Sequence, residues 1–338
     1  MSPRAQRKTD RQLEVSFDDN RRLPLLYGEH NANLARIERQ LGVRLAARGN
    51  VIGITGPRGA AETARDVLSE LWRRASADEA IGPTDIDAAL RLTEPSVKGA
   101  AKDSEGPVIR TRRRTISARS ATQAAYLKAM ERSELVIGLG PAGTGKTYLA
   151  VAQAVASLQA GAVDRIIISR PAVEAGERLG FLPGDLREKV DPYLRPIYDA
   201  LNDLLPPDQV ERRIEQGEIE IAPLAFMRGR TLSHCFVILD EGQNTTIVQM
   251  KMALTRLGEG CRMVVTGDPS QIDLPPGVRS GLLDAVEILS GVEGVSVIRF
   301  DERDVVRLPL VARIVRAYAA KPGGDEAAVR PPSRRPRT

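Results

Sequence analysis

The residues with the clearest chemical potential are Gly140-Pro-Ala-Gly-Thr-Gly-Lys-Thr147, which match the pattern G-x-x-x-x-G-K-S/T at every specified position. Glycines in such a loop let backbone N–H groups turn inward around a phosphate chain. Lys146 can reach the β- and γ-phosphates of a nucleoside triphosphate, and Thr147 can coordinate Mg²⁺. A glycine-rich turn without a ligand is the alternative. However, an apolar run precedes the loop and an Ala- and Leu-rich run follows it, which predicts the strand and helix of a P-loop.

A second cluster of candidate residues follows the apolar run Phe236-Val-Ile-Leu, which predicts a buried strand. Asp240 ends this run and can hold Mg²⁺ together with Thr147. Glu241 comes next and can orient or deprotonate a water molecule beside the γ-phosphate. An acid at this second position favours hydrolysis of the nucleotide over the alternative, a small-molecule kinase.

Further polar residues fit a helicase-like nucleotide site. Gln271, which follows another apolar run, is a candidate γ-phosphate sensor, and Gln123 can hydrogen-bond adenine. Arg303 and Arg307 can contact the γ-phosphate in cis or from a neighbouring subunit, with a surface salt bridge as the alternative for each. The predicted catalytic residues are thus Lys146, Glu241, Gln271, Arg303 and Arg307. The predicted cofactor-binding residues are Gln123, Gly140, Pro141, Ala142, Gly143, Thr144, Gly145, Lys146, Thr147 and Tyr148.

The bulk composition suits a folded protein of about two domains. The chain has 338 residues, of which 42% are hydrophobic and 28% charged. No apolar run approaches the roughly 18 residues of a membrane span, and the N-terminus lacks the apolar region of a signal peptide. Cys235 and Cys261 lie at the ends of apolar runs and are expected to be reduced core residues. These features predict a cytoplasmic protein, and the net charge of +5 is compatible with nucleic-acid binding without requiring it.

The chain divides by composition into five parts. We expect a flexible N-terminus at 1–20, a small α/β domain at 21–93, a basic linker at 94–120, a P-loop ATPase domain at 121–320 and a disordered tail at 321–338. In the small domain, apolar spacing predicts strands at 23–27, 44–47 and 51–55, helices at 31–41 and 59–74, and a short helix from Pro83 with Thr84 as its N-cap. In the large domain, continuous apolar runs predict parallel strands near 135–139, 165–169, 235–239, 262–266 and 295–300.

The predicted linker carries five arginines and no acid between Gly106 and Ser120. Arginines in such a segment can contact the phosphate backbone of a nucleic acid, or they can simply be solvated. The segment 169–184 is also polar and rich in glycine and proline, so we expect it to contact nucleic acid or a neighbouring subunit. Because aromatic residues are only 4% of the chain, phosphate contacts are favoured over base stacking.

Five ordered blocks resemble the PhoH-like ATPases, a family that is similar to the first core domain of superfamily 1 helicases. The blocks are residues 140–147, 169–184, Asp240-Glu-Gly-Gln-Asn-Thr-Thr246, Thr266-Gly-Asp-Pro-Ser-Gln-Ile-Asp-Leu-Pro275 and Asp304-Val-Val-Arg307. Gly242, Pro269-Ser270 and Leu308 depart from the usual pattern, and Leu308 leaves the roles of Arg303 and Arg307 open. The resemblance implies an α/β, RecA-like parallel sheet that binds ATP and Mg²⁺.

The YbeZ branch of this family has a KH-like N-terminal domain, which residues 21–77 resemble in outline. A KH loop has the pattern G-x-x-G, and the candidate here, Gly28-Glu29-His30-Asn31, lacks the second glycine. The domain is therefore expected to bind RNA, with protein docking as the alternative. The resemblance also implies an endoribonuclease partner similar to YbeY. We expect an RNA-associated ATPase that remodels single-stranded RNA, or alternatively an ATP-driven switch that recruits a nuclease. One core domain would need a homo-oligomer, such as a hexameric ring, for motor action.

Overall fold

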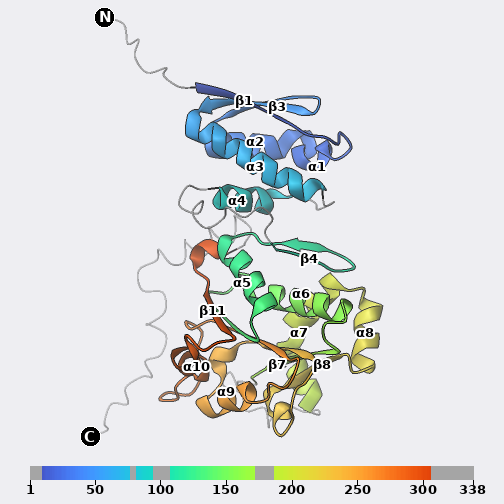
Figure 1. Ribbon diagram of the computed structural model, residues 1–338, viewed down its shortest axis with the longest axis vertical. Coiled ribbons are helices and arrows are strands. Elements are labelled where there is room, and N and C mark those ends of the chain that lie inside the picture. The colour runs from blue at the N-terminus through green and yellow to red at the C-terminus, as the bar shows by residue number, and fades with distance from the viewer. Residues whose placement is uncertain (1–9, 77–80, 94–106, 172–185, 306–338) are drawn as a thin grey trace, which may run out of the picture.

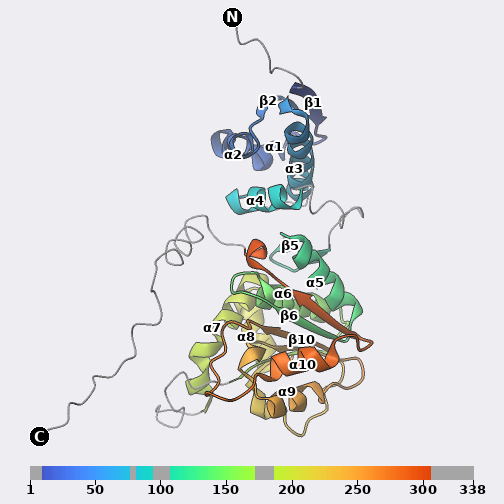
Figure 2. The ribbon, with the colours of Figure 1, turned by 90° about the vertical axis from the view of Figure 1, so that its left-hand side faces the viewer.

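The computed structural model describes residues 10–76, 81–93, 107–171 and 186–305, which form two units stacked along the long axis of the molecule (Figure 1). The N-terminal unit ends at helix α4 (Pro83–Leu92), and this helix lies next to the C-terminal unit in both views (Figures 1 and 2). Within the described ranges, none of the helices combines the length and the apolar character that crossing a membrane requires.

The C-terminal unit is built on a six-stranded parallel sheet with the order β11-β6-β10-β9-β7-β8. Its strands are β6 (Leu135–Leu139), β7 (Arg165–Arg170), β8 (Ile219–Pro223), β9 (Cys235–Leu239), β10 (Arg262–Gly267) and β11 (Val295–Arg299). Five of them were predicted, and their continuous apolar runs reflect burial on both faces. The sixth, β8, escaped prediction because it lies at the sheet edge and contains a charged residue, Glu220. The predicted α/β parallel-sheet fold is confirmed.

Helices cover both faces of this sheet, because alternate residues of each strand point to opposite sides. On one face, Val136 of β6 belongs to a hydrophobic cluster that includes residues of α5 (Ala121–Arg132), α6 (Lys146–Gln159), α7 (Leu186–Leu204) and α8 (Pro207–Glu215). On the other face, the neighbouring Leu135 and Ile137 belong to a second cluster that includes residues of η3 (Leu224–Met227), α9 (Ile247–Leu254) and α10 (Gly281–Leu289). All six strands end at the same edge, so the loops that follow β6, β9 and β10 meet there.

The N-terminal unit is a three-stranded antiparallel sheet packed against helices, with the strand order β1-β3-β2. Its other elements are α1 (Leu23–Tyr27), η1 (Glu29–Asn31), α2 (Ala32–Leu41), β2 (Arg44–Arg48), β3 (Val51–Pro57) and α3 (Arg58–Ser76). The first strand, β1 (Asp10–Ser16), pairs with β3 along its whole length. This strand lies inside the segment predicted to be flexible, so the unit begins about ten residues earlier than the predicted boundary.

Two local predictions for this unit are wrong. The predicted strand at 23–27 is helix α1, which buries Leu23 and Leu26 and carries proline in its first turn. A short apolar run does not distinguish a strand from a helix by periodicity, and proline favours the helix start. The predicted cap Thr84 lies inside α4, which begins at Pro83. The backbone N–H of Gly82 instead donates to the carboxylate of Asp85 over 3.0 Å.

The second half of the predicted linker is a β-hairpin attached to the C-terminal unit. Its strands are β4 (Val108–Arg110) and β5 (Thr115–Ser117), and Ile109 packs in the C-terminal core. At the tip, Arg113 donates to the carbonyl oxygen of Asn202 over 2.5 Å, and Arg114 lies 2.7 Å from the carboxylate of Asp203. These arginines, predicted to be solvated or to contact nucleic acid, hold the hairpin against α7.

The two cysteines lie together although they are distant in sequence. Cys235 begins β9 and Cys261 precedes β10, and their sulfur atoms are 3.5 Å apart. Both side chains are free and buried. The prediction of reduced core residues is confirmed for this structure, and the pairing of β9 with β10 explains their proximity.

Candidate nucleotide-binding site

The loop between β6 and α6 has the backbone of a phosphate cradle. Gly140, Gly143 and Gly145 adopt φ angles of 144°, 86° and 84°, which side chains other than hydrogen rarely allow. If Gly140 were replaced by a larger residue, its Cβ atom would lie 2.5 Å from the backbone oxygen of Phe300, which follows the neighbouring strand β11. This distance is too short for a normal contact. The glycines therefore keep the loop close to the sheet, and α6 begins directly after it at Lys146.

The Lys146 amine lies within this loop. Its Nζ donates to the carbonyl oxygens of Gly140 over 2.6 Å and of Pro141 over 2.9 Å. Burial lowers the pKa of Lys146, and the carboxylates of Asp268, Glu241 and Asp240 counteract this effect in part. The hydrogen bonds of Nζ go to neutral oxygens, so a phosphate would supply an opposite charge in direct contact with the ammonium.

Oxygen atoms suited to Mg²⁺ meet beside the start of α6. The hydroxyls of Thr147 and Thr266 both donate to Oδ1 of Asp240, over 2.7 and 2.5 Å. Asp240 is buried at the end of β9, and hard oxygen donors of this kind are the ligands that Mg²⁺ prefers. The residues present therefore fit the predicted metal site of Thr147 and Asp240, and Thr266 is a further oxygen that the sequence had not singled out.

Glu241 lies next to this group with an unusual backbone. Its φ and ψ angles are 54° and 38°, a left-handed conformation that a residue with a side chain adopts at some cost. One carboxylate oxygen lies 3.3 Å from Nη2 of Arg170, and the other accepts a 2.6 Å hydrogen bond from Gln243. Strain of this kind is common where a side chain must be aimed at a reacting group.

These residues line one cavity of about 240 Å³ at the carboxyl edge of the sheet. Its walls are Ala142, Gly143, Gly145, Lys146, Thr147, Tyr148, Asp240, Glu241, Thr266, Gly267, Asp268 and Gln271. Gln271 donates to Asp268 over 2.7 Å. Burial opposes ionisation of Asp268, but hydrogen bonds from Ser270 and the nearby Lys146 outweigh it and lower the pKa of this carboxyl group. Asp268 had no predicted role, although its position after β10 could have suggested one.

Gln123 lies under the phosphate loop and is almost fully buried, with 4% of its surface exposed. Its Oε1 accepts from the backbone N–H of Arg119 over 2.7 Å, and its Nε2 donates to the carbonyl oxygen of Thr144 over 2.9 Å. To recognise adenine, the Gln123 amide would have to donate one hydrogen bond to the base and accept another from it. Each end of the amide has one partner within the protein and keeps one further site, and Gln123 also lines the larger cavity described below. Because the side chain is almost fully buried, the geometry favours a role in supporting the loop.

We therefore expect replacement of Gln123 by alanine to weaken ATP and GTP binding by the same factor, roughly fivefold, because one hydrogen bond that supports the loop is lost. Titration with fluorescent analogues of both nucleotides measures the two affinities. Gln40→Ala, on the N-terminal unit, is the control for loss of an amide. Selective loss of ATP binding would instead support the predicted contact with adenine.

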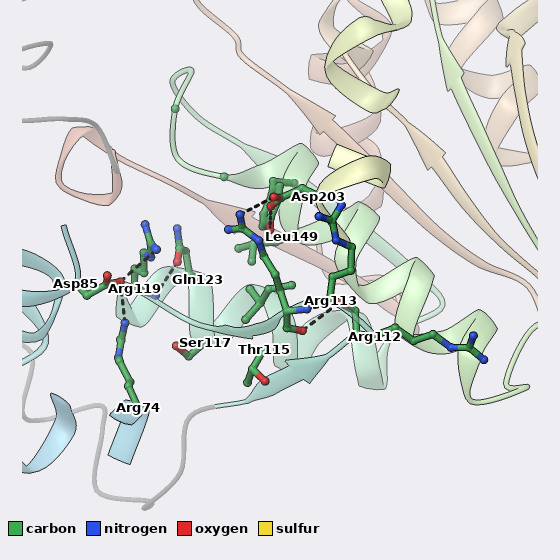
Figure 3. A pocket seen from close by; sticks show the side chains of 16 residues that line it. Arg74, Asp85, Arg112, Arg113, Thr115, Ser117, Arg119, Gln123, Leu149 and Asp203 are labelled. Atoms are coloured by element: carbon green, nitrogen blue, oxygen red, sulfur yellow. Dashed lines mark hydrogen bonds and ion pairs between the residues drawn. The ribbon is translucent and has the colours of Figure 1, made fainter. Parts of the chain in front are cut away.

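A larger cavity of about 810 Å³ adjoins the phosphate loop on the side of the hairpin (Figure 3). Arg74 and Asp85 reach it from the N-terminal unit, and Arg119 lies 3.1 Å from Asp85 across the boundary between the units. The predicted ligand-binding residue Tyr148 lines both cavities, and its hydroxyl donates to Asp203 over 2.7 Å. Burial and this hydrogen bond raise the pKa of Tyr148. A nucleoside attached to phosphates in the loop therefore has space beside the hairpin.

Of the two predicted arginines, the described one, Arg303, is not brought into this site. The Arg303 side chain is 89% exposed and lies 2.7 Å from the Asp301 carboxylate. It does not line the described nucleotide cavity, and Arg307 lies outside the described residues. Most of the segment 169–184 lies outside them as well. Pro141, Thr144 and Gly140 support the loop and do not line the cavity where the phosphates would lie.

Comparison with known proteins gives the family. Residues 115–319 match the model of the PhoH-like protein family. The chain belongs to that family. A PhoH-like protein of Bacillus subtilis is 49% identical over 302 residues, which is 87% of this chain and 92% of the relative. One from Mycobacterium tuberculosis is 46% identical over 319 residues, covering 93% of this chain and 90% of the relative.

Protein PhoH of Escherichia coli is 50% identical over 206 residues, or 60% of this chain and 58% of that protein. A Sulfolobus solfataricus SWI2/SNF2 ATPase core solved with double-stranded DNA aligns with a TM-score of 0.32 at 14% identity, over 53% of this chain and 42% of that chain. As a PhoH-like protein with this sheet and phosphate loop, the chain has the P-loop NTPase fold and is a nucleotide-binding protein of the ATPase type.

Proposed function

We propose that this PhoH-like protein is a Mg²⁺-dependent ATPase whose hydrolysis of ATP is coupled to binding or remodelling of RNA. The observation that carries the proposal is the convergence of Lys146, Thr147, Asp240 and Glu241 on one cavity. These side chains come from two separate segments of the sequence. Together they supply a cation, two oxygen ligands and a carboxylate, which is the set that hydrolysis of a phosphoanhydride needs.

Each of these residues has a distinct part in the proposed reaction. The Lys146 amine exchanges its carbonyl partners for phosphate oxygens and neutralises their charge. Thr147 and Asp240 would hold Mg²⁺, which would offset negative charge on the phosphates. Glu241 orients the attacking water and accepts its proton. Gln271, on the same wall, is placed to respond to the γ-phosphate.

The N-terminal unit is the proposed RNA-binding part. Its strands and α-helices follow the order β1, α1, α2, β2, β3, α3, α4, and the candidate loop Gly28–Asn31 joins the two helices α1 and α2. Gly28 has a φ angle of 70°, and Glu29, His30 and Asn31 are exposed. A protruding loop of this kind supports contact with the backbone of single-stranded RNA, as in KH domains. The acidic Glu29 would weaken such contact.

We also propose a homo-oligomer, with a hexameric ring as the arrangement to test. Arg303 is exposed and does not line the described cavity of its own chain, which supports contact with the nucleotide of a neighbouring subunit. The resemblance to the YbeZ branch motivates an endoribonuclease similar to YbeY as a partner. The free cysteine pair suits the reducing environment of the cytoplasm, where we place the protein.

The test measures ATP turnover with and without single-stranded RNA, and strand separation of an RNA duplex by the same preparation. Turnover that RNA stimulates, together with strand separation, supports remodelling. Stimulated turnover without strand separation supports the second candidate, an ATP-driven switch that recruits a nuclease. The described residues contain one six-stranded parallel sheet, which supplies a single core domain and supports keeping this candidate. A preparation without ATP hydrolysis would rule out both.

A further inference from the structure

The carboxylate of Glu241 is engaged at both oxygens. Oε1 lies 3.3 Å from the guanidinium of Arg170, which ends strand β7, and Oε2 accepts from Gln243 over 2.6 Å. A general base must offer an oxygen within about 2.6–3.2 Å of the water it activates. These two partners fix the direction in which the Glu241 carboxylate points, although each oxygen keeps one further acceptor site.

Of the two partners, Gln243 is the fixed one. It is fully buried, its Nε2 also donates to the carbonyl oxygen of Gln271 over 3.0 Å, and its Oε1 accepts from the N–H of Asp268 over 3.1 Å. Moving Gln243 would break the contact between the loops after β9 and β10. The Arg170 side chain is partly exposed, so its contact with Glu241 is the one that a ligand from outside can reach.

Arg170 can be reached from outside the nucleotide cavity. Its side chain retains 23% of its exposure, and it is absent from the described residues that line the cavity, whereas Glu241 is among them. The ion pair therefore joins a residue of the cavity wall to one that is not part of the described wall. Partly exposed ion pairs of this kind are weak, so a second anion can compete for the guanidinium.

We propose that Arg170 is a positioning residue that holds Glu241 at rest and releases it when an RNA backbone phosphate binds the guanidinium. The planar guanidinium matches a phosphate with two parallel hydrogen bonds, which a single carboxylate oxygen at 3.3 Å does not provide. Glu241 then turns toward the water of the nucleotide site. This inference rests on the proposed RNA-coupled ATPase function and supplies a physical link between its two ligands.

The experiment measures ATP turnover of the full chain with and without a single-stranded oligouridylate. We expect Arg170→Ala to raise kcat without RNA by roughly threefold to fivefold, the range set by loss of one partly exposed ion pair, with an unchanged KM and no further stimulation by RNA. Arg165→Ala removes the same charge at the other end of β7 and is the matched control, expected to behave as the wild type. Arg170→Lys keeps the positive charge but loses the paired N–H donors of the guanidinium. We therefore expect both its kcat without RNA and its stimulation by RNA to lie between those of the wild type and Arg170→Ala.

If RNA stimulates the Arg170→Ala protein as strongly as the wild type, the proposed ATPase function is not affected, but the inference about Arg170 is overturned. A lower kcat without RNA would also overturn it, because Arg170 would then support Glu241 instead of restraining it. If Arg170→Ala does not fold, Arg170→Lys decides: stimulation equal to that of the wild type counts against the inference. A wild type that hydrolyses ATP without any response to RNA would remove the RNA part of the proposed function and this inference with it.

Discussion

Replacement of Glu241 by glutamine is expected to slow ATP turnover by a factor on the order of 10² or more while ATP binding is retained. The substitution keeps the shape of the side chain and removes the carboxylate that would orient and deprotonate the water. Lys146 and the oxygens of Thr147 and Asp240 stay in place, so the contacts available to the phosphates do not change. Single-turnover hydrolysis and titration with a fluorescent ATP analogue measure the two effects separately.

Glu259→Gln, at an exposed position of the same unit, is the control for the loss of one carboxylate. It should leave both turnover and affinity unchanged. Near-normal turnover of purified Glu241→Gln would remove Glu241 from the proposed role. Loss of ATP binding would show instead that the αL turn at Glu241 depends on its charged contacts with Arg170 and Gln243.

The parts of the site that could be predicted are those encoded in short stretches of sequence. The glycines before Lys146 and the apolar run before Asp240 each specify a strand and the turn that follows it. Parallel strands then bring their carboxyl ends to one edge without further information. For the same reason, five strands of the large sheet were predicted, whereas β8 was missed because it has the mixed composition of an edge strand.

The remaining features depend on contacts between distant residues. Nothing near Arg170 in the sequence indicates that it meets Glu241, because their contact follows from the position of β7 next to β9. From the sequence, the arginines at 112–114 could be solvated or could contact phosphate. Their contacts with α7 and α8 follow from the position of the hairpin in the folded chain. Likewise, β1 has no distinctive apolar run, and its strand conformation comes from pairing with β3.

The second large effect is expected at Lys146. Replacement by alanine should weaken ATP binding by roughly tenfold to a hundredfold, which corresponds to loss of a hydrogen bond to a charged group, and should also reduce turnover. The free energy of unfolding should change little. Burial lowers the pKa of Lys146, so the charged amine is held in the folded protein at a cost, and its bonds to Gly140 and Pro141 only offset that cost.

Isothermal titration with ATP and chemical unfolding of the nucleotide-free protein measure the two quantities. Lys128→Ala, on the exposed face of α5, removes one ammonium without touching the site and is the control for net charge. A large fall in the free energy of unfolding for Lys146→Ala would mean that the amine stabilises the loop. The loss of ATP affinity would then follow from a disrupted loop conformation. An unchanged affinity would mean that the phosphates do not occupy the loop between β6 and α6, because the buried ammonium is its only cationic side chain among residues 140–147.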